Sequence, residues 1–157
     1  MKLSLSFTES EDSSGNILKN PVIAEILEKE LEKLYPDSKH FESIEISISL
    51  VSSEKIQELN KTYRNVDEAT DVLSFPLMGE EAVEVPELPV LALGDIVISP
   101  EDVKRLHKNL DFNEAMILMT VHSFLHLLGY DHDTEEKQEH MWQIQDEIKR
   151  KILEVIS

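Results

Sequence analysis

The 157-residue chain contains no cysteine, which excludes a disulfide framework and any metal site built from thiolates. This absence is typical of proteins that work in a reducing compartment. No apolar stretch approaches the roughly 20 residues that a membrane-spanning helix requires. The segment from Met1 to Ser10 also lacks the long apolar core of a secretory signal. We therefore expect a cytoplasmic protein that does not associate with a membrane.

Basic residues are scarce as well. Lysine and arginine number 15 against 32 aspartate and glutamate residues, which gives a formal net charge of −17. Proteins that bind long nucleic acids without sequence preference are usually basic, so this balance argues against such binding. It still allows a local positive site around a metal ion. The acidic residues concentrate at 25–32 and 80–87, which we interpret as a solvated helix face and a solvated loop.

The apolar residues that are present follow two clear periodicities. Alternation with polar residues predicts strands near 3–7, 44–50, 72–75 and 91–98, the last one broken by a glycine. Helical spacing predicts helices near 21–34, 52–63, 99–109 and 114–128, and a last helix from about residue 134; the expected caps include Ser52 or Ser53, Ser99 and Asn113. Proline and glycine mark 78–89 as a long surface loop. The order β-α-β-α-β-β-α-α-α predicts one α+β domain over residues 1–157, with a mixed sheet of about four strands packed against helices.

The helix predicted at 114–128 is apolar on nearly every side, so we expect it to be buried at the centre of the domain. The motif H-S-F-L-H-L-L-G-Y-D-H begins in the second half of this helix and runs from His122 to His132. His122 and His126 are four residues apart and project from one helix face. Gly129 stands where the helix would end, and the chain can then bring His132 back towards the first two rings. Three converging imidazoles suit one Zn²⁺ ion with an open position for water.

The spacing of this motif matches the zinc-peptidase pattern H-E-x-x-H-x-x-G-x-x-H, except that Ser123 occupies the glutamate position. A serine hydroxyl is a poor base near neutral pH. The motif thus predicts a zincin-like zinc-binding helix without the carboxylate that a peptidase uses for proton transfer. Asp131 and Ser123 are nearby candidates for the general acid, and neither can be assigned; Asp131 can instead orient a ligand ring.

Together these residues resemble the YbeY family, whose signature is H-G-x-L-H-L-x-G-Y-D-H. Ser123 replaces the usual glycine without changing a ligand. Two further stretches agree with the family: L-N-K-T-Y-R at 59–64, followed by T-D-V-L-S-F-P at 70–76, and L-G-D-I-V-I-S at 93–99. Ala69 stands where proline is common. The agreement covers roughly residues 52–133.

This resemblance implies a zinc-dependent, single-strand-specific endoribonuclease that acts in 16S rRNA 3′-end maturation and ribosome quality control. It implies that His122, His126 and His132 hold one Zn²⁺ ion, and that Arg64 is a key functional residue. We therefore predict Arg64 and His122 as catalytic residues. The implied partners are single-stranded rRNA and the small ribosomal subunit or its proteins, and no small organic cofactor is expected. Nickel or another divalent ion can occupy the same imidazoles.

The chemistry favours a nuclease, because a cationic site attracts a phosphodiester and Arg64 can contact two phosphate oxygens. Two alternatives remain. A non-catalytic, zinc-stabilised ribosome assembly factor is favoured modestly by the negative charge, since an acidic protein engages basic ribosomal proteins. A zincin-type metallopeptidase is less favoured because of Ser123.

Several polar and aromatic residues allow more than one interpretation. Arg64 can form a surface ion pair with a nearby acidic residue, Asp67, Glu68 or Asp71, as readily as it can bind phosphate. His107 belongs to a basic cluster that we interpret as an exposed helix face. For Tyr63 and Phe75, core packing is favoured over base stacking. Asp95 can cap, form a turn or face the site.

Overall fold

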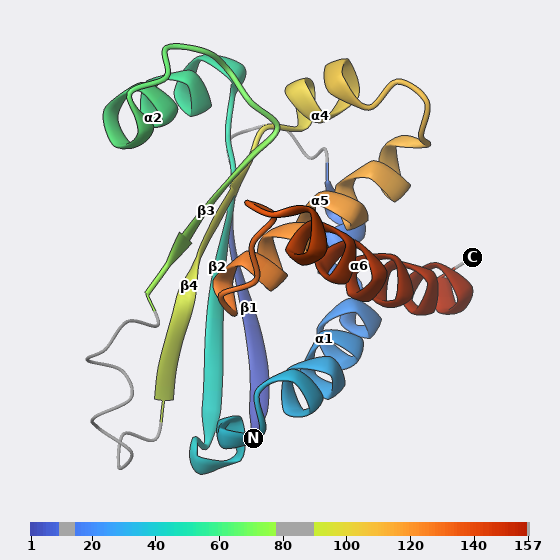
Figure 1. Cartoon of the computed structure of the whole chain (residues 1–157). Coiled ribbons are helices and arrows are strands. Elements are labelled where there is room, and N and C mark those ends of the chain that lie inside the picture. Colours follow the sequence, from blue (N-terminus) through green and yellow to red (C-terminus); the bar gives the residue numbers. More distant parts are fainter. Residues whose placement is uncertain (10–14, 78–89, 157) are drawn as a thin grey trace.

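A four-stranded sheet organises the molecule in the computed structural model, which describes residues 1–9, 15–77 and 90–156. Its spatial order is β1-β2-β4-β3. The first three of these strands run parallel, and β3 pairs antiparallel with β4 at the edge (Figure 1). The strands are β1 (Lys2–Glu9), β2 (Ser43–Leu50), β3 (Val72–Pro76) and β4 (Val90–Ile98). The predicted mixed sheet of an α+β fold is confirmed.

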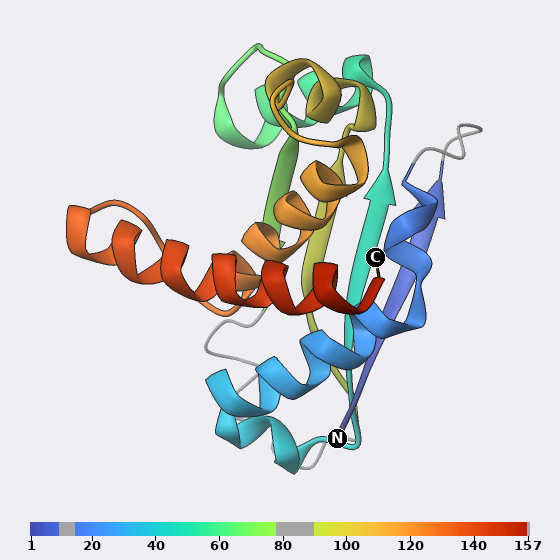
Figure 2. The same cartoon turned by 90° about the vertical axis from the view of Figure 1, so that its right-hand side faces the viewer.

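The helices lie mainly on one side of this sheet. Figures 1 and 2 show α1, α5 and α6 on the same face, whereas α2 packs on the other face near β3. The α-helices are α1 (Pro21–Leu34), α2 (Ser53–Arg64), α4 (Pro100–Leu106), α5 (Phe112–Leu127) and α6 (Glu135–Ile156). Two short 3-10 helices, η1 (Asn16–Lys19) and η2 (Pro36–His40), lie in segments that the sequence did not predict to be helical.

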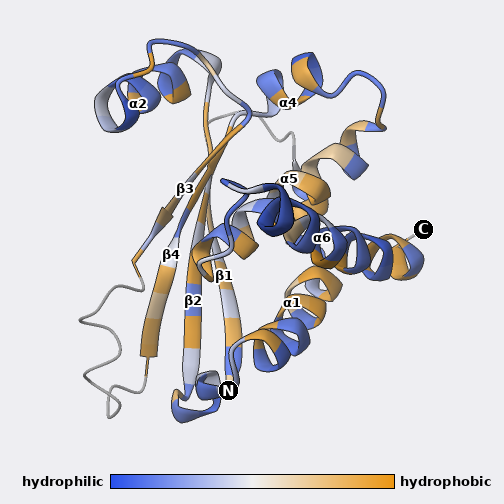
Figure 3. Ribbon diagram, viewed as in Figure 1, coloured by the Kyte–Doolittle hydropathy of each residue, from blue (hydrophilic) through white to orange (hydrophobic). Residues whose placement is uncertain are grey.

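The α5 helix is buried at the centre, as its apolar composition predicted. Ten of its residues are buried, on every side of the helix, and it contacts β3, β4, α4 and α6. Figure 3 shows α5 coloured largely as hydrophobic, whereas α6 presents a hydrophilic outer face. Because α5 is held on all sides, the histidines near its C-terminal end have a fixed position relative to the sheet.

Some helix boundaries differ from the predictions. The cap of α5 is Asp111 rather than Asn113, because an Asp111 carboxylate oxygen accepts hydrogen bonds from the backbone N–H groups of Asn113 and Glu114, at 3.2 and 3.4 Å. The α4 helix ends at Leu106, short of the predicted Asn109. By contrast, Ser52 and Ser99 cap α2 and α4 as expected.

The β4 strand continues through Gly94 rather than breaking there. A register shift against β2 between Glu45 and Ile46 accommodates the irregularity. A Cβ atom at Gly94 would lie 2.6 Å from Leu127 Cδ2 and 2.7 Å from the Phe75 carbonyl oxygen. The missing side chain thus lets α5 approach the sheet closely at this point.

The predicted loop at 78–89, including its acidic run, lies outside the described residues. In the part of the chain that the structure describes, no helix has both the length and the hydrophobicity for crossing a membrane.

Candidate active site

The three motif histidines converge, as their spacing predicted. The ring centroids of His122 and His126 are 4.5 Å apart, and His132 lies 5.8 Å from the first and 5.2 Å from the second. One nitrogen from each ring can be chosen so that all three lie within 4.8 Å of one another. His122 and His126 are half-buried on α5, whereas His132 is exposed. The group therefore has one open side.

Hydrogen bonds orient the two helical histidines. His122 Nδ1 lies 2.8 Å from Gln145 Oε1, and His126 Nδ1 lies 2.9 Å from the carbonyl oxygen of Tyr130. A carbonyl oxygen can only accept, so each Nδ1 carries the hydrogen and each Nε2 of a neutral ring presents its lone pair. The two Nε2 atoms face each other at 3.0 Å. Facing lone pairs repel unless a cation lies between them, so the donor set fits a metal ion.

The turn after α5 brings His132 into place. Gly129 adopts a left-handed conformation with φ of 95°, which confirms the predicted helix end. The N–H groups of Gly129 and Tyr130 then bond to the carbonyls of His126 and Leu125, both at 3.0 Å. Asp131 accepts a hydrogen bond from the backbone N–H of His132 at 2.7 Å. This carboxylate therefore holds the main chain of the third ligand.

Burial lowers the pKa of both helical histidines. For His122 the main cause is desolvation, to which the charge of His132 adds. For His126 desolvation again dominates, followed by the neighbouring His122. The lowered pKa favours the neutral imidazole, which is the form that binds a metal. The site is thus prepared for a cation near neutral pH.

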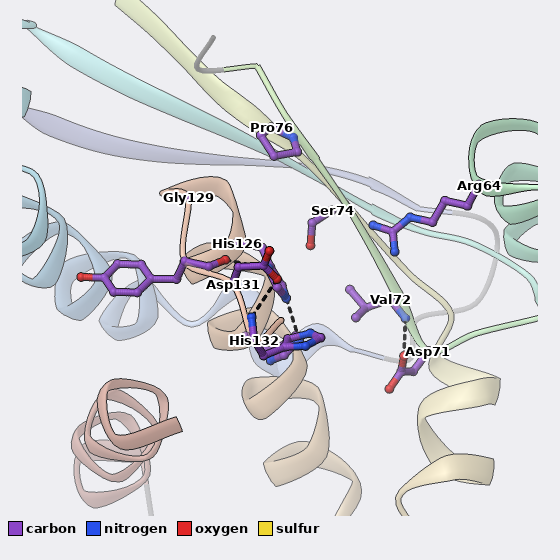
Figure 4. A pocket seen from close by; sticks show the side chains of 11 residues that line it. Arg64, Asp71, Val72, Ser74, Pro76, His126, Gly129, Asp131 and His132 are labelled. Atoms are coloured by element: carbon purple, nitrogen blue, oxygen red, sulfur yellow. Dashed lines mark hydrogen bonds between the residues drawn. The ribbon is translucent and has the colours of Figure 1, made fainter. Parts of the chain in front are cut away.

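A cavity of about 480 Å³ opens in front of the histidines, a size typical of ligand sites. It lies between the end of α5 and the edge strand β3, as Figure 4 shows. Besides the three histidines, its lining residues are Arg64, Asp71, Val72, Ser74, Pro76, Gly129, Tyr130 and Asp131. The structure therefore brings the histidine motif and the 59–76 stretch to one place.

Arg64 is the last residue of α2, and its side chain points into this cavity towards Ser74 (Figure 4). The alternative of a surface ion pair is not found in the described part of the chain. Asp67 instead lies 4.0 Å from Lys61, and Asp71 lies 2.7 Å from His107 Nε2. Among the described residues Arg64 has no acidic partner, which leaves its guanidinium available to an anion.

The hydrogen-bond register of β3 determines what its free edge offers. Ser99 N–H bonds to the Asp71 carbonyl at 2.9 Å, and Leu77 N–H bonds to the Leu93 carbonyl at 3.0 Å. Pairing alternates along an antiparallel ladder, so the odd-numbered residues from 71 to 77 bond to β4. The backbone groups of Val72, Ser74 and Pro76 therefore point away from β4, and their side chains face the cavity.

Among the described residues, that edge of β3 has one N–H group available. Val72 N–H is occupied by the Asp71 carboxylate at 2.8 Å, and Pro76 has no N–H. Ser74 N–H points away from β4, and neither it nor the Ser74 hydroxyl has a hydrogen-bond partner among the described residues. The edge thus presents a single amide donor beside a hydroxyl, close to Arg64.

Some residues differ from the sequence interpretation. Ser123 is fully buried and its hydroxyl has no hydrogen-bond partner among the described residues, so it cannot exchange protons with the cavity. Tyr63 is 65 % exposed and meets the partly buried Phe75 only edge-on at 5.4 Å, so core packing was wrong for Tyr63. His107 is half-buried against Asp71 rather than exposed. Asp95 pairs with Phe75 on the sheet face away from the cavity.

Sequence reasoning missed Gln145, Ser74 and the Asp71–His107 contact. Gln145 lies 23 residues after His122, and nothing in the pattern of α6 distinguishes it from a surface glutamine. Ser74 had a usable signal, because alternation along 72–76 places it on the same face as Val72 and Pro76.

These features define an α+β protein with a three-histidine candidate metal centre at the end of a buried helix. A family model described as "Endoribonuclease YbeY" matches residues 7–153, and the chain belongs to this family. A relative from Thermoanaerobacter sp. (strain X514), named Endoribonuclease YbeY, is 38% identical over 141 residues, or 83% of this chain and 87% of the relative. Another of that name, from Bacillus subtilis (strain 168), is 38% identical over 136 residues, or 80% and 86% of the two chains.

A solved structure supports the same fold. The solution structure of TM1509 from Thermotoga maritima superposes with a TM-score of 0.56 at 27% sequence identity. The match covers 95% of this chain and 89% of TM1509. The similarity thus extends well beyond the histidine motif and includes the sheet and its helices.

Proposed function

We propose that this protein is a zinc-dependent endoribonuclease that cleaves single-stranded RNA. Its family supports the endoribonuclease activity. One observation carries the metal dependence: two hydrogen-bonded imidazoles direct their bare Nε2 atoms at each other across 3.0 Å, next to a third imidazole. A metal ion, or a proton shared by the two Nε2 atoms, turns that arrangement from repulsive to favourable, and the third imidazole beside them favours the metal ion. Three neutral nitrogen ligands with an open side suit zinc, and nickel is the competing ion.

In this proposal His122, His126 and His132 hold the ion, and Arg64 binds the substrate. A zinc ion held by three neutral imidazoles supplies an acidified water near neutral pH and a positive charge for a phosphoryl oxygen. Arg64 remains charged at any relevant pH and can donate two hydrogen bonds to one phosphate. Its lack of an acidic partner among the described residues means that no existing ion pair must be broken.

Proton transfer is assigned to Asp131 in the same proposal. Two carboxylates line the cavity, Asp71 and Asp131. Both oxygens of Asp71 already accept hydrogen bonds, from Val72 N–H and Thr70 on one side and from His107 on the other. One oxygen of Asp131 holds His132 N–H, and the second has no partner among the described residues. That second oxygen can take up or deliver a proton in the cavity.

The edge of β3 argues against the metallopeptidase alternative. Enzymes that bind an extended peptide along a sheet edge need several free backbone donors and acceptors in register. Here Val72 N–H is occupied and Pro76 has none, so a peptide would meet one amide donor over the length of β3. A buried Ser123 at the glutamate position adds to the argument.

We infer further that the substrate is 16S rRNA near its 3′ end, in the cytoplasm, and that the protein engages the small ribosomal subunit or its proteins. The family resemblance supports this setting. The net charge of −17 supports contacts with basic ribosomal proteins rather than with long stretches of RNA. No small organic cofactor is required by this chemistry. The alternative, a non-catalytic assembly factor stabilised by zinc, predicts normal ribosome maturation without RNA cleavage.

The test uses purified protein with bound metal quantified beforehand. A single-stranded RNA and its duplex are incubated with wild type, with and without a chelator, and then with zinc or nickel restored. We expect cleavage of the single strand only, loss with chelator and recovery with zinc. His126→Ala should lose both metal and cleavage, whereas His40→Ala, on η2, should keep both. Cleavage that survives chelation and His126→Ala would overturn the proposal.

A further inference from the structure

We propose that Ser74 and Arg64 form a phosphate-binding subsite at the free edge of β3, which holds the RNA phosphodiester beside the three histidines. This inference rests on the proposed nuclease function and adds a substrate-binding residue to it. The subsite consists of the Ser74 N–H, the Ser74 hydroxyl and the Arg64 guanidinium. All three belong to residues that line the same cavity as the histidines.

The backbone hydrogen bonds of β3 to β4 alternate along the strand, and this leaves Ser74 N–H free of β4. The ladder to β4 uses the odd-numbered residues, so the Ser74 N–H points out of the sheet while its side chain faces the cavity. One residue thus presents two donors in adjacent directions. The edge of a sheet with unpaired N–H groups is a recognised anion-binding concavity. A phosphate oxygen satisfies such donors better than a carbonyl oxygen, because its charge shortens and strengthens the bonds.

The neighbouring edge positions, Val72 and Pro76, cannot compete with Ser74 for an anion. The Asp71 carboxylate already accepts the Val72 N–H hydrogen bond, and Pro76 has no N–H to donate. An anion at this edge is therefore directed to Ser74. Arg64 reaches the same point from α2, around the edge strand, and its guanidinium is directed towards Ser74 (Figure 4). Two independent elements of the fold converge on one location.

The charges around the cavity also favour a local phosphate site. The chain carries a net charge of −17, and Asp71 and Asp131 also line the cavity. A phosphodiester therefore needs local donors that outweigh this background. Both carboxylate oxygens of Asp71 already accept hydrogen bonds, one from Val72 N–H and the other from His107 at 2.7 Å, which reduces repulsion on the Ser74 side of the cavity. Arg64 and Ser74 then lie on one side of the phosphate, and the histidine cluster that would hold the cation lies on the other.

The direct test follows the Ser74 amide by NMR in zinc-loaded, ¹⁵N-labelled protein. Dimethyl phosphate, a phosphodiester without base or sugar, is titrated in one arm, and acetate in a second arm. We expect a saturable downfield shift of the Ser74 amide with dimethyl phosphate that is much smaller with acetate. An unmoved Ser74 amide, or an equal response to acetate, would overturn the phosphate subsite. This test does not depend on RNA cleavage.

A kinetic test uses the hydroxyl. Ser74→Ala should raise KM for a single-stranded RNA about tenfold with kcat nearly unchanged, as expected for the loss of one hydrogen bond to a charged group. Ser74→Thr keeps both donors and should behave as wild type. Ser4→Ala, a half-buried serine on the opposite edge strand β1, is the matched control.

The outcomes separate the two proposals. If wild type cleaves RNA and Ser74→Ala has an unchanged KM, the subsite is wrong and the nuclease proposal stands. If wild type does not cleave, the nuclease proposal fails and the NMR titration alone decides whether this edge binds phosphate. If Ser74→Ala fails to fold, the NMR titration of the wild-type protein still provides the test.

Discussion

Gln145 determines how the first ligand of the candidate metal centre is presented. Its side-chain oxygen accepts the His122 Nδ1 hydrogen at 2.8 Å, which turns Nε2 towards His126. His126 is oriented in the same way, because its Nδ1 hydrogen bonds to the backbone carbonyl of Tyr130. No side-chain substitution removes that acceptor directly. Gln145 is therefore the position at which metal affinity can be altered without touching a ligand.

We predict that Gln145→Leu weakens zinc binding about 10- to 100-fold, because His122 loses the acceptor that fixes its ring. Gln145→Glu should bind zinc at least as tightly as wild type, because a carboxylate raises the basicity of the ligand. Competition with a chromophoric chelator measures the affinity. Gln143→Leu, exposed on the same helix, is the control and should match wild type. Equal affinities for the two leucine variants would contradict the assigned role.

A second prediction concerns pH and the metal-free protein. Burial lowers the pKa of His122 and His126 in the folded state, whereas in the unfolded chain both titrate near about 6.5. The unfolded chain then binds more protons just below that pH, so the free energy of unfolding falls as the pH drops through this value. Urea denaturation of the chelator-treated protein from about pH 8 to about pH 5.5 measures the slope.

The double variant His122→Gln, His126→Gln provides the reference for this slope, because other groups also titrate in the range. Its free energy of unfolding should depend less on pH than that of wild type between about pH 6.5 and 5.5. A slope as steep as that of wild type would mean that neither ring has a lowered pKa.

At single positions, the sequence predicted what depends on local geometry. The i, i+4 spacing of His122 and His126 and the left-handed turn at Gly129 follow from helix geometry alone, and both were confirmed. Gln145 and the Asp71–His107 contact depend on how distant elements pack, which spacing does not encode. The role of Arg64 was undecided for the same reason, since the cavity that its side chain enters is lined by β3 and by the turn after α5.

Contact between α5 and β4 fixes the distance from the histidines to the edge strand. At Gly94 an added Cβ would meet Leu127 of α5 and backbone atoms of β3. Both flanking contacts leave no room for a methyl group. The cavity in front of the histidines therefore depends on a residue that never touches a ligand.

We predict that Gly94→Ala lowers the free energy of unfolding by about 2 kcal/mol, because the added Cβ must displace Leu127 or the β3 backbone. Gly129→Ala is the comparison, because its Cβ would meet no atom within 4 Å. The only cost is then the strain of an alanine in the left-handed conformation, about 1 kcal/mol. Urea denaturation gives both values. The steric argument fails if Gly94→Ala is the less costly of the two.

For whole helices and strands, periodicity was sufficient to predict existence and order but not boundaries. The four strands and five α-helices follow the predicted order in the described residues. Errors gathered at ends, where one competing cap decides: Asp111 rather than Asn113 starts α5. Arg64, expected in an irregular segment, closes α2, and Asn65 ends that helix in a left-handed conformation. The helix thus extends one residue further than predicted, and the Arg64 side chain reaches the cavity from its end.

The net charge of the whole molecule opposes the approach of a nucleic acid. The net charge is −17, and the one basic cluster noted in the sequence is largely occupied. Arg105 bonds to Asp102 at 2.9 Å, and Lys104 lies over the Phe112 ring at 4.8 Å. RNA therefore meets long-range repulsion and a local attraction at the cavity.

We predict that the KM for a short single-stranded RNA changes little, or falls, as monovalent salt rises from about 20 to about 100 mM. Screening weakens the repulsion over longer distances than it weakens the contacts inside the cavity. Steady-state cleavage at several salt concentrations measures the trend. A steep rise of KM, typical of proteins that neutralise many phosphates, would indicate an extended basic surface and would contradict this interpretation.

Gln145 belongs to the C-terminal helix, so a ribosome synthesises all three histidines before the side chain that aligns the first of them. The geometry that receives the cation is complete only after α6 has been made and packed against α5. A growing chain thus carries the ligands in an unassembled form.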